Sequence, residues 1–271
     1  MKYLFITDDP AMAAYVDACG VDRLFVDLET LGKQERQGRF DTVISRHDAR
    51  NVGPVKAAAR RAEVMVRLNP LHAGSDREVD AAIDTGADSL MLPMFRMAEE
   101  VAGFCRLVRG RVPVIPLVET ADALRSLRDV IAVEGVTEIH VGLNDLHRDL
   151  GLRFLFEPLA SGLVEAATEH CRRRGMPFGV GGVSRVGHGE IPGELVLAEH
   201  CRIGSSRAIL SRAFHERAKT LDELRAKIDL PTEIGKLRVA EWKLLRRTPE
   251  EIEQDKQRFR HAVLNVVRKA A

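Results

Sequence analysis

The feature that most constrains the fold is a regular alternation of short apolar runs with helical patterns. Eight runs have the length of buried parallel strands: Tyr3–Thr7, Arg23–Glu29, Val64–Asn69, Ser89–Met94, Val112–Glu119, Glu138–Asp145, Pro177–Gly182 and Arg202–Ser205. Apolar residues at helical spacing predict helices between them, including Asp76–Thr85, Ala98–Arg109, Ala121–Val133 and Phe156–Arg174. Strands that alternate with helices build parallel sheets. Eight units in 271 residues predict an α/β protein of the (β/α)8 TIM-barrel class, with an open doubly wound sheet as the alternative.

The chain after residue 215 does not continue this alternation. Thr220-Leu-Asp-Glu and Thr248-Pro-Glu-Glu each match the capping box that opens a helix. An apolar stripe follows the second box, formed by Ile252, Phe259, Ala262, Val263, Val266 and Val267. We therefore predict a TIM-barrel catalytic domain over residues 1–215 and a C-terminal helical extension over 216–271. This stripe is expected to pack on a partner subunit of a homo-oligomer, or on the barrel of its own chain.

The charge balance argues against a nucleic-acid-binding protein. Lys and Arg number 41 against 40 for Asp and Glu, whereas a broad nucleic-acid footprint needs a basic face. Aromatic residues make up only 5% of the chain, too few for platforms on which bases stack. No apolar run reaches the roughly 18 residues that a membrane helix needs. We expect neither nucleic acid nor a membrane as a partner.

Cysteine usage and the N-terminus bear on the cellular compartment. The cysteines are Cys19, Cys105, Cys171 and Cys201. They form no Cys-x-x-Cys pair and are predicted to be reduced core residues. The first apolar stretch ends at Asp8 and Asp9, which is too short for the core of a signal peptide. These features predict a cytoplasmic protein.

Two strand-like runs end in carboxylates. Val-Ile-Pro-Leu-Val-Glu-Thr (114–120) places Glu119 at a strand end, and Ile-His-Val-Gly-Leu-Asn-Asp (139–145) does the same for Asp145. Active sites of TIM barrels lie at this end of the strands. A buried carboxylate is costly unless something binds it, and Mg²⁺ commonly uses one or two carboxylates. We predict a divalent-metal site at Glu119 and Asp145, the alternative being that both acids cap helices.

Charged residues also end the second and third strands. Arg67 in Val-Met-Val-Arg-Leu-Asn is a permanent cation in an otherwise apolar run, and a planar guanidinium suits a carboxylate or an enolate. Asp27 and Glu29 share one strand face by alternation. They are expected to orient metal-bound water or Arg67, and a purely structural pairing with Arg67 is the alternative.

A polar loop and a glycine turn complete the predicted site. Residues 30–46 form a long loop on the catalytic side, with a short extra strand expected at Thr42–Ser45. His47 follows that loop and is the first candidate for the acid/base group, with His147 as its rival. The turn after Gly142 leaves the backbone N–H groups of Asn144 and Asp145 available to a substrate carboxylate.

Five motifs occur in order along the chain: Phe-Val-Asp-Leu-Glu, Val-Arg-Leu-Asn, Leu-Pro-Met, Pro-Leu-Val-Glu-Thr and Gly-Leu-Asn-Asp-Leu. Together they resemble the HpcH/HpaI aldolase and citrate lyase β-subunit family of phosphoenolpyruvate/pyruvate-type barrels, over about residues 20–210. The resemblance implies a class II, metal-dependent enzyme in which Glu119 and Asp145 match the metal ligands. Arg67 matches the substrate-anchoring arginine, and Asp27 and Glu29 match the acids around it. It also implies a trimer or hexamer, because subunits of the family often exchange C-terminal helices.

The sequence departs from the family pattern at two places. Thr30 stands where the aldolases usually carry a histidine and the citrate lyase-like members an aspartate. The usual Gly-Pro-x-Asp is Gly-Leu-Asn-Asp here. The acid/base group is therefore open, and His47 would have to fold back over the site.

These features lead to one leading hypothesis and two alternatives. The leading hypothesis is a class II aldolase, a carbon–carbon lyase that acts on a pyruvate-like 2-oxo acid and an aldehyde. Mg²⁺ is the first expectation for its metal, with Mn²⁺ and Co²⁺ as alternatives. Loop 30–46 and the loops after strands seven and eight, with Arg185 and His188, would select the aldehyde. The alternatives are an acyl-CoA lyase of the citramalyl- or malyl-CoA type, and a non-catalytic barrel.

Overall fold

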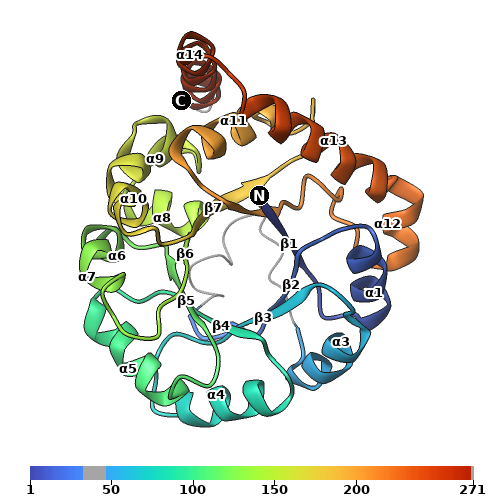
Figure 1. Ribbon diagram of the computed structural model, residues 1–271, viewed down its shortest axis with the longest axis vertical. Helices are drawn as coiled ribbons and strands as arrows, with labels where there is room; N and C mark the ends of the chain where they lie inside the picture. Colours follow the sequence, from blue (N-terminus) through green and yellow to red (C-terminus); the bar gives the residue numbers. More distant parts are fainter. Residues whose placement is uncertain (33–46, 270–271) are drawn as a thin grey trace.

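Eight parallel strands close into a barrel in sequence order in the computed structural model, which describes residues 1–32 and 47–269 (Figure 1). The strands are β1 Lys2–Ile6, β2 Arg23–Asp27, β3 Glu63–Arg67, β4 Ser89–Leu92, β5 Val114–Val118, β6 Ile139–Val141, β7 Phe178–Val183 and β8 Arg207–Leu210. β1 pairs with both β2 and β8, which closes the sheet. The predicted TIM barrel is confirmed. The extra strand expected at Thr42–Ser45 lies outside the described residues.

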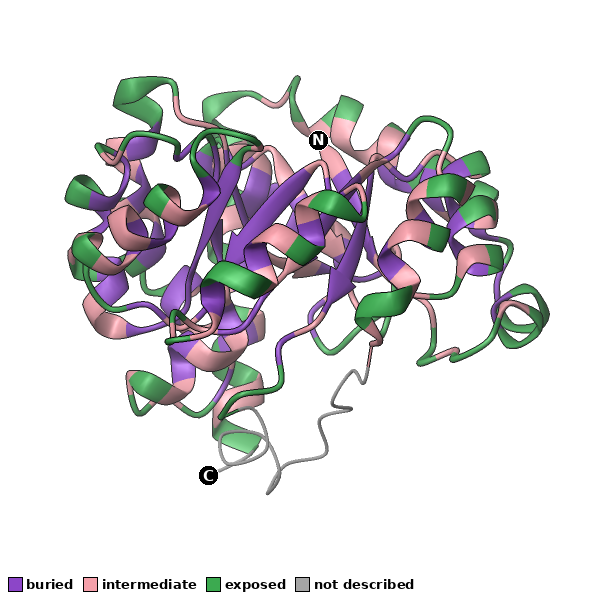
Figure 2. Cartoon of the chain, turned by 90° about the horizontal axis from the view of Figure 1, so that it is seen from below, coloured by how far each residue is buried: buried purple, intermediate pink, exposed green. Residues whose placement is uncertain are grey.

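Helices form a ring around the barrel (Figure 1). They are α1 Pro10–Ala18, η1 Ala49–Asn51, α3 Val52–Ala58, α4 Ser75–Asp84, α5 Ala98–Val108, α6 Ala121–Arg125, α7 Leu127–Val130, α8 Leu143–Asp149, α9 Glu157–Ala160, α10 Leu163–Arg174, α11 Gly193–Ile203, α12 Leu221–Lys227, α13 Leu230–Leu244 and α14 Pro249–Lys269. Figure 2 shows that the strands are buried while the outer helix faces are exposed. No helix among the described residues is long and apolar enough to cross a bilayer.

The predicted eighth strand is wrong. Arg202 and Ile203 are the last residues of α11, and Gly204 caps that helix with a φ of 79°. Ile203 is fully buried as part of the helix, so its apolar character belongs to a helical face. The strand begins only after this turn, at Arg207. As a consequence, the loop at the catalytic end of β8 starts at Ser211, several residues later than the sequence suggested.

Two predicted helices are interrupted. Ser126 separates α6 from α7, so Ala121–Val133 is not one helix. Gly162 has a φ of 85° between α9 and α10, a left-handed conformation that suits glycine and breaks the helical path. The outer ends of these helices are capped: Thr120 accepts a hydrogen bond from the Ala123 N–H at 3.0 Å, and Gly175 ends α10 with a φ of 65°.

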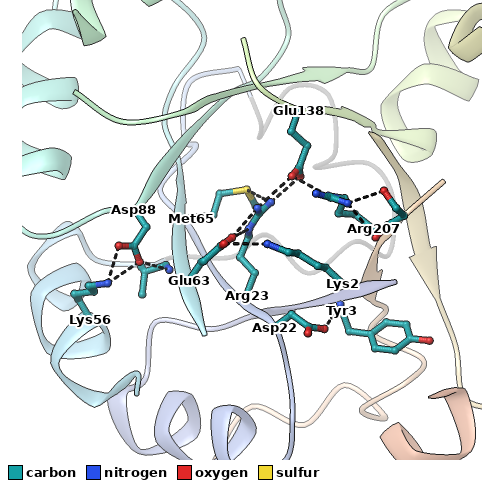
Figure 3. Close-up of polar contacts among 12 residues, drawn as sticks. Lys2, Tyr3, Asp22, Arg23, Lys56, Glu63, Met65, Asp88, Glu138 and Arg207 are labelled. Carbon is teal, nitrogen blue, oxygen red and sulfur yellow. Dashed lines mark hydrogen bonds and ion pairs between the residues drawn. The ribbon is translucent and has the colours of Figure 1, made fainter. Parts of the chain in front are cut away.

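The barrel interior is apolar in its middle and charged at its N-terminal end. An inner cluster is formed by Leu4, Phe25, Met65, Met91, Ile115 and Leu117. Beneath it Glu138 lies between Arg23 and Arg207, at 2.7 and 2.8 Å, and Arg23 also pairs with Glu63 at 2.8 Å (Figure 3). Lys2 pairs with the same Glu63 at 2.9 Å. This ion network, hereafter the basal ion network, occupies the N-terminal mouth of the barrel.

The helices after β8 pack against their own chain. The second predicted capping box forms in full, since Thr248 and Glu251 bond reciprocally at 3.3 and 2.8 Å. The first forms in half: Thr220 accepts from the Glu223 N–H, whereas the Glu223 carboxylate accepts from the Lys219 N–H. α14 lies on α11 and α9, and its residues Phe259 and Val263 are buried. The apolar stripe therefore contacts the barrel of its own chain, and a further contact with a partner subunit stays a prediction, as does a domain boundary at residue 215.

Candidate active site at the carboxyl end of the barrel

A cavity of about 600 Å³ opens at the carboxyl ends of the strands. Six residues that the sequence singled out line it: Asp27, His47, Arg67, Glu119, Asn144 and Asp145. Its other walls come from β1, β7 and the segment after β8. The volume is typical of a small-molecule site.

Glu119 is a buried carboxylate, only 3% exposed. It follows β5, and its Oε1 accepts a hydrogen bond from the Met94 N–H at 3.1 Å. Within the described part of the chain, no Lys, Arg or His side chain forms an ion pair with it. Burial raises the pKa of Glu119 to about 8; Arg67 opposes this rise, and the carboxylates of Asp145 and Glu29 add to it. Arg67 therefore only partly offsets the cost of burying a charge on Glu119.

A glycine lets the two strand ends approach. A Cβ on Gly142 would lie 2.9 Å from both the Cβ and Oε2 of Glu119. Gly142 also caps α8, so the carboxylate of Asp145 sits in the first turn of that helix with its side chain 11% exposed. The Leu146 N–H donates to the Gly142 carbonyl oxygen at 3.1 Å. The preceding N–H groups, those of Asn144 and Asp145, lie in the first turn of α8, where N–H groups have no backbone acceptor within the helix.

Neither carboxylate acts as a helix cap. The N-cap of α6 is Thr120, one residue after Glu119, and the N-cap of α8 is Gly142. The alternative explanation of the two strand-end acids therefore does not describe this structure. Both carboxylates instead line one cavity.

The donor set fits a hard divalent cation. Among residues 1–32 and 47–269, no group of three or more His, Cys, Asp or Glu side chains is arranged as a metal cage. Two carboxylates that leave the other positions to water and substrate are the donor set that Mg²⁺ accepts. The buried, incompletely offset charge of Glu119 is the property that a bound cation would stabilise.

Arg67 is held beside the carboxylate pair by two acids. Its Nε and Nη2 donate to the two oxygens of Asp27 at 2.9 Å each, and Nη2 lies 3.3 Å from Glu29. Asp27 and Arg67 are register partners on β2 and β3. Burial acts to lower the pKa of Arg67, but Asp27 and Glu29 more than offset this, so the pKa is raised and the charge is permanent. The structural pairing is present, and the guanidinium nevertheless lines the cavity.

Thr30 forms hydrogen bonds that fix the start of the loop after β2. Its N–H and the N–H of Leu31 both donate to Asn69 Oδ1 at 2.8 Å, and its hydroxyl donates to the same oxygen at 3.3 Å. Asn69 in turn donates to Glu78 at 2.7 Å. Position 30 therefore organises the start of the loop.

His47 does reach the site. Its Nδ1 accepts the backbone N–H of Asp27 at 2.9 Å, and its Nε2 lies 3.6 Å from Asp8 Oδ1. Because Nδ1 is an acceptor, the neutral ring carries its proton on Nε2, toward Asp8. The rival His147 is buried with Nδ1 at 3.1 Å from the Leu143 oxygen, inside its own helix. Burial lowers the pKa of His147.

The sequence did not reveal the wall of the cavity after β8. Arg212, His215, Arg217 and Lys219 line it. His215 lies against Phe5 with ring centroids 5.3 Å apart, and burial lowers its pKa to about 4. The sequence does contain basic residues and a histidine directly after β8, in Ser-Arg-Ala-Phe-His-Glu-Arg (211–217). They are not recognised as following a strand when the eighth strand is predicted to end at Ser205.

Comparisons with known proteins agree with this geometry. Residues 3–157 match the family model described as HpcH/HpaI aldolase/citrate lyase. No curated protein matches the sequence.

Solved structures of similar fold include an HpcH/HpaI aldolase from Desulfitobacterium hafniense, with a TM-score of 0.61 and 17% identity over 78% of this chain and 85% of that one. An HpcH/HpaI aldolase/citrate lyase family protein from Burkholderia cenocepacia gives 0.60 and 20%, over 83% and 94%. The citrate synthase SbnG gives 0.61 and 18%, over 86% and 94%. At these identities the likeness establishes the fold.

Proposed function

Because the chain belongs to the HpcH/HpaI aldolase/citrate lyase family, whose members named above are aldolases and lyases, we propose that it is a divalent-metal-dependent carbon–carbon lyase. The reaction is an aldol cleavage or condensation in which a pyruvate-like 2-oxo acid is the enolate half. The observation that carries the proposal is the buried Glu119 beside Asp145, with Arg67 lining the same cavity.

Glu119 and Asp145 are the residues that would hold the metal. A bound Mg²⁺ would polarise the keto and carboxylate oxygens of the 2-oxo acid and stabilise negative charge on its enolate. Gly142 leaves the space in which the Glu119 carboxylate lies beside the start of α8. Mn²⁺ and Co²⁺ are the alternative metals, because they can bind the same oxygen donors.

Arg67 and the first turn of α8 supply the remaining positive potential. The guanidinium is fixed by Asp27 and Glu29, so it is already oriented when the substrate enters and loses little freedom on binding. The N–H groups of Asn144 and Asp145 lie in the first turn of α8, where the helix dipole favours a bound anion. Together they would hold the carboxylate and enolate oxygen of the 2-oxo acid.

We assign proton transfer to the pair formed by His47 and Asp8. In cleavage, the hydroxyl proton of the aldol leaves its oxygen for the Asp8 carboxylate, which the Nε2–H of His47 faces, while the carbon–carbon bond breaks. The bond electrons remain on the enolate, the aldehyde departs, and the enolate carbon then takes up the proton that the pair holds. His47 lies between the Asp27 N–H and the Asp8 carboxylate, so its ring is oriented on both sides.

One observation favours an acyl-CoA thioester as a second candidate substrate. Such a substrate brings phosphates to the barrel mouth, and Arg212, Arg217 and Lys219 place cations there. Turnover of citramalyl- or malyl-CoA against free 2-oxo acids separates the two.

Deuterium exchange into the methyl group of pyruvate tests the proposal without knowledge of the aldehyde. In D₂O with Mg²⁺, NMR should show enzyme-dependent exchange that ceases on chelation and falls by about 10²-fold or more in Glu119→Gln. Glu134→Gln, at an exposed position, is the control. Wild-type protein that binds Mg²⁺ yet exchanges no deuterium would contradict the pyruvate enolate.

A further inference from the structure

The N-terminal end of the barrel also holds a cavity, of about 590 Å³, beside the basal ion network. Strand alternation explains its shape, because the residue two positions before each member of the inner apolar cluster points into the barrel as well. These side chains are long at Lys2, Arg23 and Glu63, where they form the network. They are short at Ser89 and Pro113, and both of these residues line the cavity. The space therefore lies where β4 and β5 begin.

The residues that line this cavity carry more positive than negative charge. Five are basic and three acidic: Arg23, Lys56, Arg60, Arg61 and Arg207 against Glu63, Asp88 and Glu138. Lys56 and Asp88 pair at 2.7 Å and neutralise each other (Figure 3). Glu63 and Glu138 are each already shared by two cations of the basal ion network. The lining therefore has an excess of two positive charges.

This excess lies on Arg60 and Arg61, which are exposed and form no ion pair within residues 1–32 and 47–269. The Arg61 guanidinium donates to the backbone oxygens of Asp17 and Ala18, at 2.8 and 3.2 Å. The turn that carries both arginines is fixed, because the N–H groups of Arg60 and Ala62 donate to the buried Asp17 carboxylate at 2.9 and 2.8 Å. The Arg60 guanidinium is left available beside the cavity.

Ser89 adds a buried hydroxyl to the same cavity. It is only 4% exposed, and in the described part of the chain its Oγ has no hydrogen-bond partner. A buried polar atom without a partner is destabilising and rare. Ser89 begins β4 and is the register partner of Met65 on β3, the strand that starts three residues after Arg60. An oxygen acceptor bound in the cavity would satisfy this hydroxyl.

We propose that this cavity binds a phosphate group, with the Ser89 hydroxyl and the Arg60 guanidinium as donors to its oxygens. A phosphate carries close to two negative charges near neutral pH, which matches the excess positive charge of the lining. Its oxygens can accept both the paired donors of a guanidinium and a separate hydroxyl. Because about 590 Å³ exceeds the size of a phosphate ion, the phosphate is either free or carried by a small metabolite. The inference does not rest on the reaction at the carboxyl end of the barrel.

Calorimetric titration of inorganic phosphate, in the absence of Mg²⁺, tests this inference. We expect saturable binding in the wild type and a Kd raised about tenfold in Ser89→Ala and in Arg60→Gln, as for a lost hydrogen bond to a charged group. Arg106→Gln removes an exposed charge on α5, away from both cavities, and should keep the wild-type Kd. Glycerol 3-phosphate that binds more tightly than inorganic phosphate would identify a phosphorylated metabolite as the ligand, and equal Kd values the free ion.

Thermal unfolding of Ser89→Ala gives a second, independent readout. Without phosphate this variant should unfold at the wild-type temperature or above it, because it removes an unpartnered buried hydroxyl. Saturating phosphate should raise the unfolding temperature of the wild type more than that of the variant. No phosphate binding in the wild type, or equal Kd values in the wild type and both variants, would overturn the inference. Binding that is lost in Arg212→Gln but kept in Ser89→Ala would also overturn it, by placing the phosphate in the cavity at the carboxyl end.

Discussion

Single residues decide whether the candidate metal site can form. Gly142 has φ −89° and ψ 91°, a conformation that alanine adopts easily. The main obstacle to a side chain there is Glu119, whose Cβ and Oε2 would each lie 2.9 Å from an added Cβ. Gly142 therefore matters because of the space that it leaves for Glu119. A substitution at Gly142 tests how far the site depends on the position of that carboxylate.

We expect Gly142→Ala to weaken Mg²⁺ binding by about 10- to 100-fold, because the new methyl group displaces Glu119, and such changes around metal ligands have effects of that size. Calorimetric titration of Mg²⁺ measures this. Gly235→Ala in α13, where nothing lies within 4 Å of the added Cβ, is the matched control. Unaltered affinity in Gly142→Ala would show that the Glu119 position is not critical.

The sequence identified most of the candidate site residues because strand ends are readable. An apolar run that ends in a charge points to Glu119, Arg67 and Asp27, which line one cavity. Asp145 lines the same cavity, but the predicted strand Glu138–Asp145 ends at Val141 and Asp145 lies in the first turn of α8. Arg212 and His215 were not found, because they depend on where β8 ends. Asp8 was also missed, since its approach to His47 at 3.6 Å joins segments that are far apart in the sequence.

At the scale of elements, the two ends of the barrel differ: the carboxyl end holds the candidate active site and the N-terminal end holds the basal ion network. In this network Glu138 is buried between Arg23 and Arg207 (Figure 3). The sequence did not predict this network, because the charged residues at strand starts resemble ordinary surface positions. Its members meet only when the sheet closes.

We predict that Glu138→Gln lowers the free energy of unfolding by about 3 kcal/mol or more, because it removes the anion that buried Arg23 shares with half-buried Arg207. Urea denaturation measures the change. Glu63→Gln, whose side chain is 44% exposed, should cost about 1 kcal/mol or less. Equal losses of unfolding free energy in the two variants would show that the contribution of the network does not depend on burial.

Element boundaries were predicted less well than element types. Gly162 and Ser126 each interrupt a pattern whose apolar spacing remains helical, because periodicity reports the buried face and not the continuity of hydrogen bonds. The eighth strand was displaced for a related reason: Ile203 is as buried in α11 as it would be in a strand.

At the scale of the whole molecule, buried neutral histidines link folding to pH. Burial lowers the pKa of His200 to about 3 and that of His140 to about 4. Their unfolded pKa is near 6.5, so between these values the unfolded chain binds more protons than the folded one. Their contribution to stability is complete above pH 6.5 and is lost as the pH falls toward 4.

We expect the free energy of unfolding to fall by about 1.4 kcal/mol per pH unit for each of these histidines below pH 6. Urea unfolding of wild type and His200→Gln at pH 7.5 and 5.5 tests this. The variant should lose roughly one histidine's share of the pH dependence, whatever its stability at pH 7.5. Identical pH dependence in the two proteins would mean that His200 is not kept neutral by the fold.

The proposed function requires that Glu119 and Asp145 hold a metal to which a 2-oxo acid enolate binds. Oxalate mimics that enolate, so the most direct measurement is calorimetric titration of oxalate into wild type and Glu119→Gln, with and without Mg²⁺. We predict oxalate binding that requires Mg²⁺ in the wild type and is lost in the variant. Oxalate binding that is independent of Mg²⁺, or that survives in Glu119→Gln, would contradict this function.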